Sequence, residues 1–168
     1  MSEAKRTAPR PVVAVVGGGI CSPEEAAQAE AVGRHLAESG ATLICGGMGG
    51  VMAAACWGAK AAGGLTVGVL PGFSARDANP HVEVPIVTGM GEARNVIIVR
   101  TAAAIIAVGG EFGTLSEIAF ALKLGRPVVG LGTWELGKAG RPSDAIIKAQ
   151  TPQEAVRLAL EASTNPSL

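Results

Sequence analysis

The stretch Val108-Gly109-Gly110-Glu111-Phe112-Gly113-Thr114-Leu115-Ser116-Glu117 decides how this chain of 168 residues folds. It follows the apolar run from Ala102 to Val108 and opens a helical pattern that ends near Leu124. An apolar run, a glycine turn and a helix start predict a buried β-strand that leads directly into a helix. Glycine has no Cβ atom, so an oxyanion can approach the backbone N–H groups, and the helix dipole adds positive charge there. The stretch therefore predicts an anion site for phosphate, made by Gly109, Gly110, Gly113 and Thr114.

Two side chains of this stretch can carry chemistry. Thr114 can donate its hydroxyl group to the bound anion. Glu117 lies about one helical turn further along, near the anion but directed elsewhere. Since a carboxylate does not bind phosphate, Glu117 would act on a group that is attached to the phosphate.

The same pair has a second interpretation as a helix cap. Thr114-x-x-Glu117 has the spacing of a capping box, in which the two side chains satisfy free N–H groups of the first turn. Ser22-x-x-Glu25 and Thr151-x-x-Glu154 share this spacing, each with a proline at the first helical position and neither with any sign of a site. Spacing alone favours the cap, whereas the glycines before Thr114, absent from the other two, favour a ligand.

Apolar segments alternate with helical segments along the whole chain. Strands are expected at Pro11–Val16, Ala41–Cys45, Leu65–Leu70, Val84–Val87, Ala102–Val108, Pro127–Leu131 and Ala145–Ala149, and helices at 22–39, 51–62, 90–101, 114–124 and 152–162. Fully apolar strands separated by helices predict the α/β class, with a Rossmann-like, doubly wound parallel sheet and helices on both faces. One such domain over residues 11–163 is expected, after a flexible N-terminus of residues 1–10.

Three glycine clusters follow expected strands of this sheet. Ligands of such sheets bind at the carboxyl ends of the strands. Gly17–Gly19 and Gly46–Gly50 are therefore expected to line the same cleft as the Gly109–Gly113 turn. The candidate ligand-binding residues from the first two clusters are Gly18, Gly19, Gly46 and Gly47.

Two of the expected helices are too apolar to be buried on one side only. They contain Val96-Ile97-Ile98-Val99 and the run of apolar residues from Leu115 to Leu124. One face of each can contact the sheet, but the remaining apolar surface needs another cover. A second copy of the chain would supply it, so a homodimer or a higher homo-oligomer is expected; a neighbouring helix of the same chain is the alternative.

Composition excludes several classes of function. Lys and Arg number 14, as do Asp and Glu, and no basic cluster occurs, so neither a nucleic acid nor a membrane surface is an expected partner. Cys21, Cys45 and Cys56 are odd in number and share no zinc-like spacing, so no disulfide framework and no metal site are expected. The polar residues 1–10 resemble neither a signal peptide nor an anchor. We expect a cytoplasmic protein with a small-molecule ligand.

Common nucleotide-binding and hydrolytic motifs do not fit either. Gly17-Gly18-Gly19 is not followed by a third correctly spaced glycine, and the second strand ends without a carboxylate for a ribose diol, so NAD and FAD are not expected. The chain has no P-loop motif. Its two histidines, His35 and His81, belong to no Ser-His-Asp arrangement.

Several motifs together resemble the LOG (Lonely Guy) family, which was long misnamed lysine decarboxylases. They lie between about Val12 and Leu131 and are Gly46-Gly47-Met48-Gly49-Gly50-Val51-Met52, Gly58-Ala59-x-x-Ala62-Gly63-Gly64, Gly68-Val69-Leu70-Pro71, Arg94, and Gly109-Gly110-x-x-Gly113-Thr114-x-x-Glu117. The resemblance implies a phosphoribohydrolase that cleaves the N-glycosidic bond of a nucleoside 5′-monophosphate. Arg94 and Glu117 would then be catalytic: the arginine would bind the phosphate or the leaving base, and the carboxylate would stabilise the ribose cation or activate water. No cofactor is required for that reaction.

Three positions depart from the LOG pattern. Val108 replaces a proline, Glu111 adds a negative charge to the phosphate turn, and Asn95 replaces a lysine after Arg94. Together with the short chain and the ending Ala-Leu-Lys-Leu-Gly-Arg-Pro-Val-Val, they resemble the branch that includes the molybdenum-cofactor carrier proteins of algae and bacteria. This second resemblance implies a bound pterin-like ligand, the molybdenum cofactor, in place of an AMP-like one, with Glu117 as a cap only.

Overall fold

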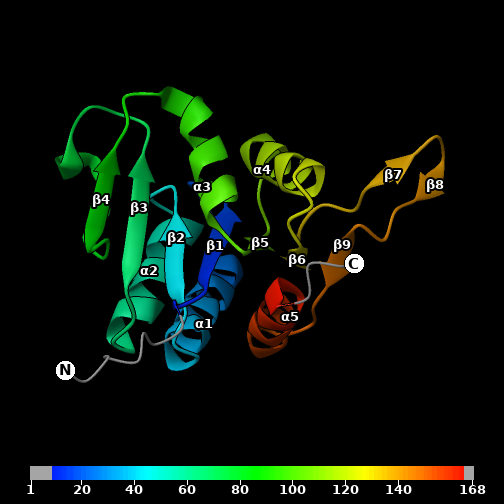
Figure 1. Cartoon of the computed structure of the whole chain (residues 1–168), viewed down its shortest axis with the longest axis horizontal. Helices are drawn as coiled ribbons and strands as arrows, with labels where there is room; N and C mark the ends of the chain where they lie inside the picture. Colours follow the sequence, from blue (N-terminus) through cyan, green and yellow to red (C-terminus); the bar gives the residue numbers. More distant parts are fainter. Residues whose placement is uncertain (1–8, 165–168) are drawn as a thin grey trace, which may run out of the picture.

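Seven parallel strands form the centre of the structure, a computed structural model that describes residues 9–164 (Figure 1). The strands are β1 (Val12–Gly17), β2 (Thr42–Cys45), β3 (Thr66–Leu70), β4 (Val84–Val87), β5 (Ala104–Val108), β6 (Val128–Leu131) and β9 (Ile146–Lys148). Their order in the sheet is β4-β3-β2-β1-β5-β6-β9. The predicted Rossmann-like, doubly wound fold is confirmed, and residues 1–8 of the expected flexible N-terminus lie outside the described residues.

Helices cover both faces of this sheet. One face carries α1 (Pro23–Glu38), α2 (Val51–Ala61) and α5 (Pro152–Thr164), and the other carries α3 (Asn95–Thr101) and α4 (Phe112–Lys123). Successive strand residues point to opposite faces, so Val13 and Val15 of β1 pack under the first group of helices, whereas Ala14 and Val16 pack under the second. This explains why the strand sequences are continuously apolar.

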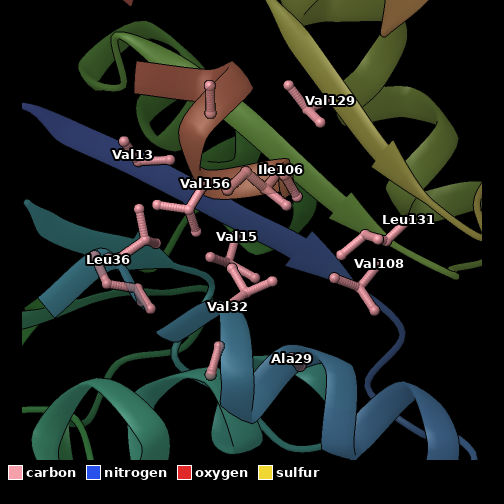
Figure 2. Packing of buried hydrophobic residues seen from close by; sticks show 14 of the residues in the cluster. Val13, Val15, Ala29, Val32, Leu36, Ile106, Val108, Val129, Leu131 and Val156 are labelled. Carbon is pink, nitrogen blue, oxygen red and sulfur yellow. The ribbon is translucent and has the colours of Figure 1, made fainter. Parts of the chain in front are cut away.

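The larger core layer lies between the sheet and α1, α2 and α5 (Figure 2). In Figure 2, Val15 and Ile106 of the sheet lie close to Val32 of α1 and Val156 of α5. Each fully buried valine or leucine side chain contributes about 1.5–3 kcal/mol relative to an exposed one. Both faces of the sheet are therefore shielded from water, and burial of these side chains stabilises the sheet between its two layers of helices.

Helices α1 and α2 cross at two glycines. A Cβ atom at Gly33 would lie 1.9 Å from the Ala55 carbonyl oxygen, and one at Gly58 would lie 1.9 Å from the Glu30 carbonyl oxygen. No side chain fits at either position. The two helices pack backbone against backbone. The Val51 N–H donates to the Gly18 carbonyl oxygen at 3.0 Å, which holds the start of α2 close to the end of β1.

Several expected boundaries are wrong. The expected helix 90–101 divides into a 3₁₀ turn, η2 (Gly91–Arg94), and α3; Gly91 adopts a positive φ angle, so a right-handed α-helix does not start at Met90. The loop after β6 contains an unexpected hairpin of β7 (Gly137–Lys138) and β8 (Arg141–Pro142), and a 3₁₀ turn, η1 (Ala75–Asp77), follows β3. Helix α4 begins at Phe112, two residues before the expected start at Thr114.

Helices α3 and α4 lie beside each other on one face of the sheet (Figure 1). Ile97, Phe120, Leu122 and Leu124 are partly buried there against the smaller core layer. The neighbouring helix thus covers part of the apolar surface that led us to expect a homodimer, and the dimer remains a prediction. Within residues 9–164, no helix is both long and apolar enough to cross a membrane.

Candidate functional site

A cavity of about 470 Å³ opens at the carboxyl ends of β1 and β5. These two neighbours are the point where the order of the sheet reverses, since β2 lies on one side of β1 and β5 on the other. Doubly wound sheets bind their ligands at this place. The cavity is lined by Val15, Val16, Gly17, Gly18, Gly19, Ile20, Gly46, Met52, Glu92, Arg94, Asn95, Glu111, Gly113, Thr114 and Glu117.

Most of the sequence-predicted site residues meet in this cavity. Gly18 and Gly19 follow β1, Gly46 follows β2, and Arg94 ends η2; α4 contributes the remaining three, which are Gly113, Thr114 and Glu117. The parallel sheet brings together segments that are about 100 residues apart in the sequence.

The first turn of α4 has free N–H groups. Its N-terminal capping residue is Glu111, which makes no side-chain capping bond. The first bond of the helix runs from the Leu115 N–H to the Glu111 carbonyl oxygen, at 3.0 Å. Among the described residues, the N–H groups of Phe112, Gly113 and Thr114 have no acceptor. The three can donate to an anion at the positive end of the helix dipole.

The interpretation of Thr114 and Glu117 as a capping box is wrong. Thr114 is the third residue of α4 and therefore lies inside the helix that it would have to precede as a cap. Its side chain is 3 % exposed, lines the cavity and has no hydrogen-bond partner within residues 9–164. The Thr114 hydroxyl group is available to a ligand.

Glu117 is a buried carboxyl group at the cavity wall. Its side chain is 8 % exposed. Burial raises the pKa of Glu117 to about 7, and the positive charge of Arg94 offsets part of this increase. At neutral pH the protonated and ionised forms are both populated, as acid–base chemistry would require.

Arg94 is held in place by backbone carbonyl groups. Its Nε atom donates to the Val69 carbonyl oxygen at 2.8 Å, and its Nη2 atom donates to the Gly46 carbonyl oxygen at 3.4 Å. These bonds join the ends of β2 and β3 and fix the guanidinium group at the cavity. The neighbouring Asn95 has a buried Oδ1 atom that finds no hydrogen-bond partner among residues 9–164. The ion pairs of the part of the chain that the structure describes do not join Arg94 to Glu117.

Three predicted glycines do not line this cavity. The Gly109 N–H donates to the Leu131 carbonyl oxygen at 3.0 Å, so it extends the sheet and cannot bind an anion. Gly110, with a φ angle of 98°, forms the turn and lines a neighbouring cavity. Gly47 also serves a turn, because its N–H contacts the Cys45 Sγ atom at 3.3 Å and its carbonyl oxygen accepts from the Asn79 N–H at 2.8 Å. The expectation that Gly109 binds the anion through its N–H group is therefore wrong, as is the expectation that Gly47 lines the same cleft.

Sequence reasoning missed other lining residues. Ile20 is 94 % exposed directly after the first glycine cluster, and its position after a strand could have indicated it. Glu92 carries no sequence signal. With Glu92, Glu111 and Glu117 on the wall, three carboxyl groups face one cation, Arg94. The cavity therefore fits a ligand that carries hydrogen-bond donors in addition to an anion.

Comparison with known proteins identifies the family. Residues 10–156 match the model of the SLOG cluster4 family. The chain belongs to the SLOG cluster4 family. This membership confirms the resemblance to the short LOG-like branch.

Relatives of this SLOG cluster4 chain include proteins named after the molybdenum cofactor. The molybdenum cofactor binding protein of Rippkaea orientalis is 32 % identical, with a TM-score of 0.83, over 92 % of this chain and 98 % of that one. The molybdenum cofactor carrier protein of Chlamydomonas reinhardtii is 33 % identical, with a TM-score of 0.81, over 93 % of this chain and 100 % of that one. An uncharacterized protein of Archaeoglobus fulgidus is 43 % identical over 90 % of this chain and 95 % of its own length.

Proposed function

We propose that this protein binds a phosphorylated pterin of the molybdenum-cofactor type and acts as a carrier. The observation that carries the proposal is the likeness, over more than nine tenths of the chain, to two solved structures named for binding or carrying that cofactor. In this proposal, Gly113, Thr114 and the free N–H groups of α4 bind the phosphate. Gly18, Gly19 and Gly46 line the same cavity and leave room beside the phosphate.

The dimensions and donors of the cavity support this proposal. A volume of about 470 Å³ is within the usual range of about 300–1,000 Å³ for small-molecule sites. Three backbone N–H groups, the Thr114 hydroxyl group and the Arg94 guanidinium group are donors that suit phosphate oxygens. No resident cofactor is required by this arrangement, because the molybdenum cofactor is the cargo.

The charge balance of the cavity also supports a pterin. Three carboxyl groups around one guanidinium group weaken the binding of a simple phosphate. A pterin carries an amino group and ring N–H groups, which donate to carboxylate oxygens, whereas an inorganic phosphate offers no comparable donors. The cavity accordingly favours a ligand with an anionic end and a donating end.

A second function is favoured by Glu117. A buried carboxyl group with a pKa of about 7, next to Arg94 and about one turn from the proposed phosphate position, suits a LOG-like phosphoribohydrolase. Glu117 would stabilise the ribose cation or activate water at the anomeric carbon. The lysine that follows the arginine in LOG enzymes is Asn95 here, which removes one cation from the site.

One experiment separates the two functions. The purified protein is examined for bound molybdopterin and is incubated with AMP and other nucleoside 5′-monophosphates to detect ribose 5-phosphate. The carrier proposal expects binding of the molybdenum cofactor and no ribose 5-phosphate. Release of ribose 5-phosphate by the wild type, with loss in Glu117→Gln, would replace the carrier proposal with the hydrolase.

A further inference from the structure

A second cavity of about 300 Å³ lies on the other side of the turn that leads into α4. It is lined by Glu25, Gly109, Gly110, Glu111, Gly132, Thr133 and Trp134. Glu111 lines both cavities, so the two are separated only by the start of α4. A ligand whose phosphate binds to the free N–H groups of α4 can extend to either side.

Trp134 lines this second cavity and pairs with Phe112, which does not line it. The ring centroids of Phe112 and Trp134 are 5.5 Å apart and the rings are tilted by 40°. Phe112, the first residue of α4, is 75 % exposed. The whole chain has three phenylalanines, two tryptophans and no tyrosine, so this pair is a large share of its aromatic surface. An exposed phenyl ring paired with a partly buried tryptophan that lines the cavity is suited to stacking with a flat ring.

The pair is fixed relative to the start of α4. Trp134 donates from its Nε1 atom to the Glu111 carbonyl oxygen at 3.2 Å. Thr133 donates from its Oγ1 atom to the Gly109 carbonyl oxygen at 2.6 Å. Both bonds attach the segment after β6 to the turn after β5, so the aromatic surface and the free N–H groups of α4 have a constant spacing.

Two carboxyl groups give this cavity its polarity. Glu25 accepts the Ser22 N–H through Oε2 at 2.8 Å, and its Oε1 atom lies against Gly109. Glu111 provides the second carboxyl group. The ion pairs found within residues 9–164 involve neither of them. The cavity therefore combines an aromatic face with carboxylate acceptors, which suits an aromatic ring that bears amino or ring N–H groups.

We infer that Phe112 and Trp134 form a ring-binding subsite that stacks on an amino-substituted heteroaromatic ring, with Glu25 and Glu111 accepting its N–H groups. This inference rests on the proposed function, because the ring belongs to the ligand whose phosphate α4 binds. It places that ring in the second cavity, where carboxyl groups and an aromatic face occur together, and not among the carboxyl groups of the first cavity. The subsite selects phosphorylated ligands by their ring, whereas Gly113 and Thr114 select them by their phosphate.

Fluorescence and calorimetry test the subsite. Trp57→Phe leaves Trp134 as the single tryptophan and keeps an aromatic ring next to His81, which Trp57 contacts at 5.0 Å between centroids. A pterin monophosphate should quench Trp134, whereas ribose 5-phosphate, which has no aromatic ring, should not. By calorimetry, Phe112→Ala should lower the affinity for the pterin monophosphate at least about fivefold, the lower end of the cost of removing a stacking side chain. The affinity for ribose 5-phosphate should not change.

Phe73→Ala is the matched control. Phe73 is 89 % exposed but follows β3, and it does not line either cavity. Its removal should leave both affinities unchanged. Trp134→Phe adds a second test, because it keeps a stacking ring and loses only the bond to Glu111; it should retain more pterin affinity than Trp134→Ala.

The results separate this inference from the proposed function. Tight binding of the pterin monophosphate without quenching of Trp134, and with equal affinity in Phe112→Ala, would overturn the subsite while the carrier proposal stands. A change in oligomer size in Phe112→Ala with unchanged pterin affinity would assign Phe112 to a contact between subunits and would also overturn it. Absence of any pterin binding by the wild type would reject both.

Discussion

The starts of α1 and α4 have the same sequence spacing and opposite roles. At α1, the Ser22 Oγ atom accepts the Glu25 N–H at 3.1 Å and the Glu25 carboxylate accepts the Ser22 N–H at 2.8 Å, so the capping box is closed. At α4, the corresponding threonine and glutamate lie inside the helix, and the N–H groups of the first turn are free. A closed cap stabilises the fold, whereas an open helix start is available to a ligand.

The residues before each helix explain the difference. Pro23 fixes the backbone at the first position of α1, so the helix starts directly after Ser22. At α4 the chain leaves β5 through Gly109 and Gly110, both with positive φ angles, and becomes helical at Phe112. The turn thus moves Thr114 from the capping position to the third position of the helix. Four substitutions test this contrast, from the largest expected effect to the smallest.

Gly113→Asp should have the largest effect on binding. An ideal Cβ atom at Gly113 meets nothing within 4 Å, so the variant should fold. Its carboxylate would lie where the phosphate is proposed to bind, and two like charges about 4 Å apart repel by about 4 kcal/mol at an effective dielectric constant of 20. We expect the affinity for a pterin monophosphate to fall at least about 100-fold by calorimetry. Gln153→Asp, at the second position of α5, is the matched control and should bind normally; unchanged affinity in Gly113→Asp would reject the open start as the phosphate site.

Glu117→Gln should change the dependence of stability on pH. The folded-state pKa of about 7 is above the value of 4.5 expected in the unfolded chain. Folding thus favours the protonated form of Glu117. The contribution of this form to the free energy of unfolding is fully present below about pH 4.5 and is lost as the pH rises through 7. The loss is about 3 kcal/mol for a shift of this size. Glutamine stays neutral, so Glu117→Gln should be more stable than the wild type at pH 8 in urea unfolding.

Urea unfolding of the wild type and Glu117→Gln at pH 5 is the control. At this pH the Glu117 carboxyl group of the folded wild type is mostly protonated, so the two proteins should unfold at similar urea concentrations. Glu25→Gln, in the closed box of α1, should show no gain at pH 8. Equal stability of Glu117→Gln and the wild type at both pH values would show that the carboxyl group is hydrated in the folded protein.

Thr114→Val should weaken ligand binding without loss of stability. The Thr114 hydroxyl group has no partner within the described residues, so valine removes no protein hydrogen bond. A hydrogen bond to a charged group contributes about 1.5–3 kcal/mol, and we expect the affinity for the pterin monophosphate to fall about tenfold or more. Thr114→Ser retains the hydroxyl group and should restore most of the affinity. If Thr114→Val lowers the midpoint of urea unfolding and leaves binding normal, Thr114 has a structural role and does not bind the ligand.

Ser22→Ala should show the opposite pattern. It opens the capping box of α1 and should lower the free energy of unfolding by about 1 kcal/mol. Thr151→Ala should do the same at α5, where the Thr151 Oγ1 atom accepts the Glu154 N–H at 3.2 Å. Calorimetric affinity for the pterin monophosphate should be unchanged in both. A loss of affinity in Ser22→Ala would mean that the position of Glu25, and with it the second cavity, depends on the closed box.

The sequence by itself determined the sheet and most of its helices. Continuous apolar strands such as Ala104–Val108 can be buried only between two layers of helices, and the glycines after β1, β2 and β5 place the ligand cleft at one edge. The glycine turn and the helix start indicated Gly113, Thr114 and Glu117 as site residues, whereas the resemblance to the LOG family indicated Arg94. The closed box at Ser22 and the side-chain cap at Thr151 are local as well, since all their bonds join residues at most four positions apart.

Only the tertiary structure decided how these residues are used. Whether Gly109 donates to a ligand depends on Leu131 of the next strand, and the start of α4 depends on the turn that connects it to β5. The pKa of Glu117 depends on burial by segments that are far apart in the sequence, and the pairing of Phe112 with Trp134 depends on the loop after β6. These properties arise from contacts between distant residues, which the pattern of neighbouring residues in the sequence does not contain.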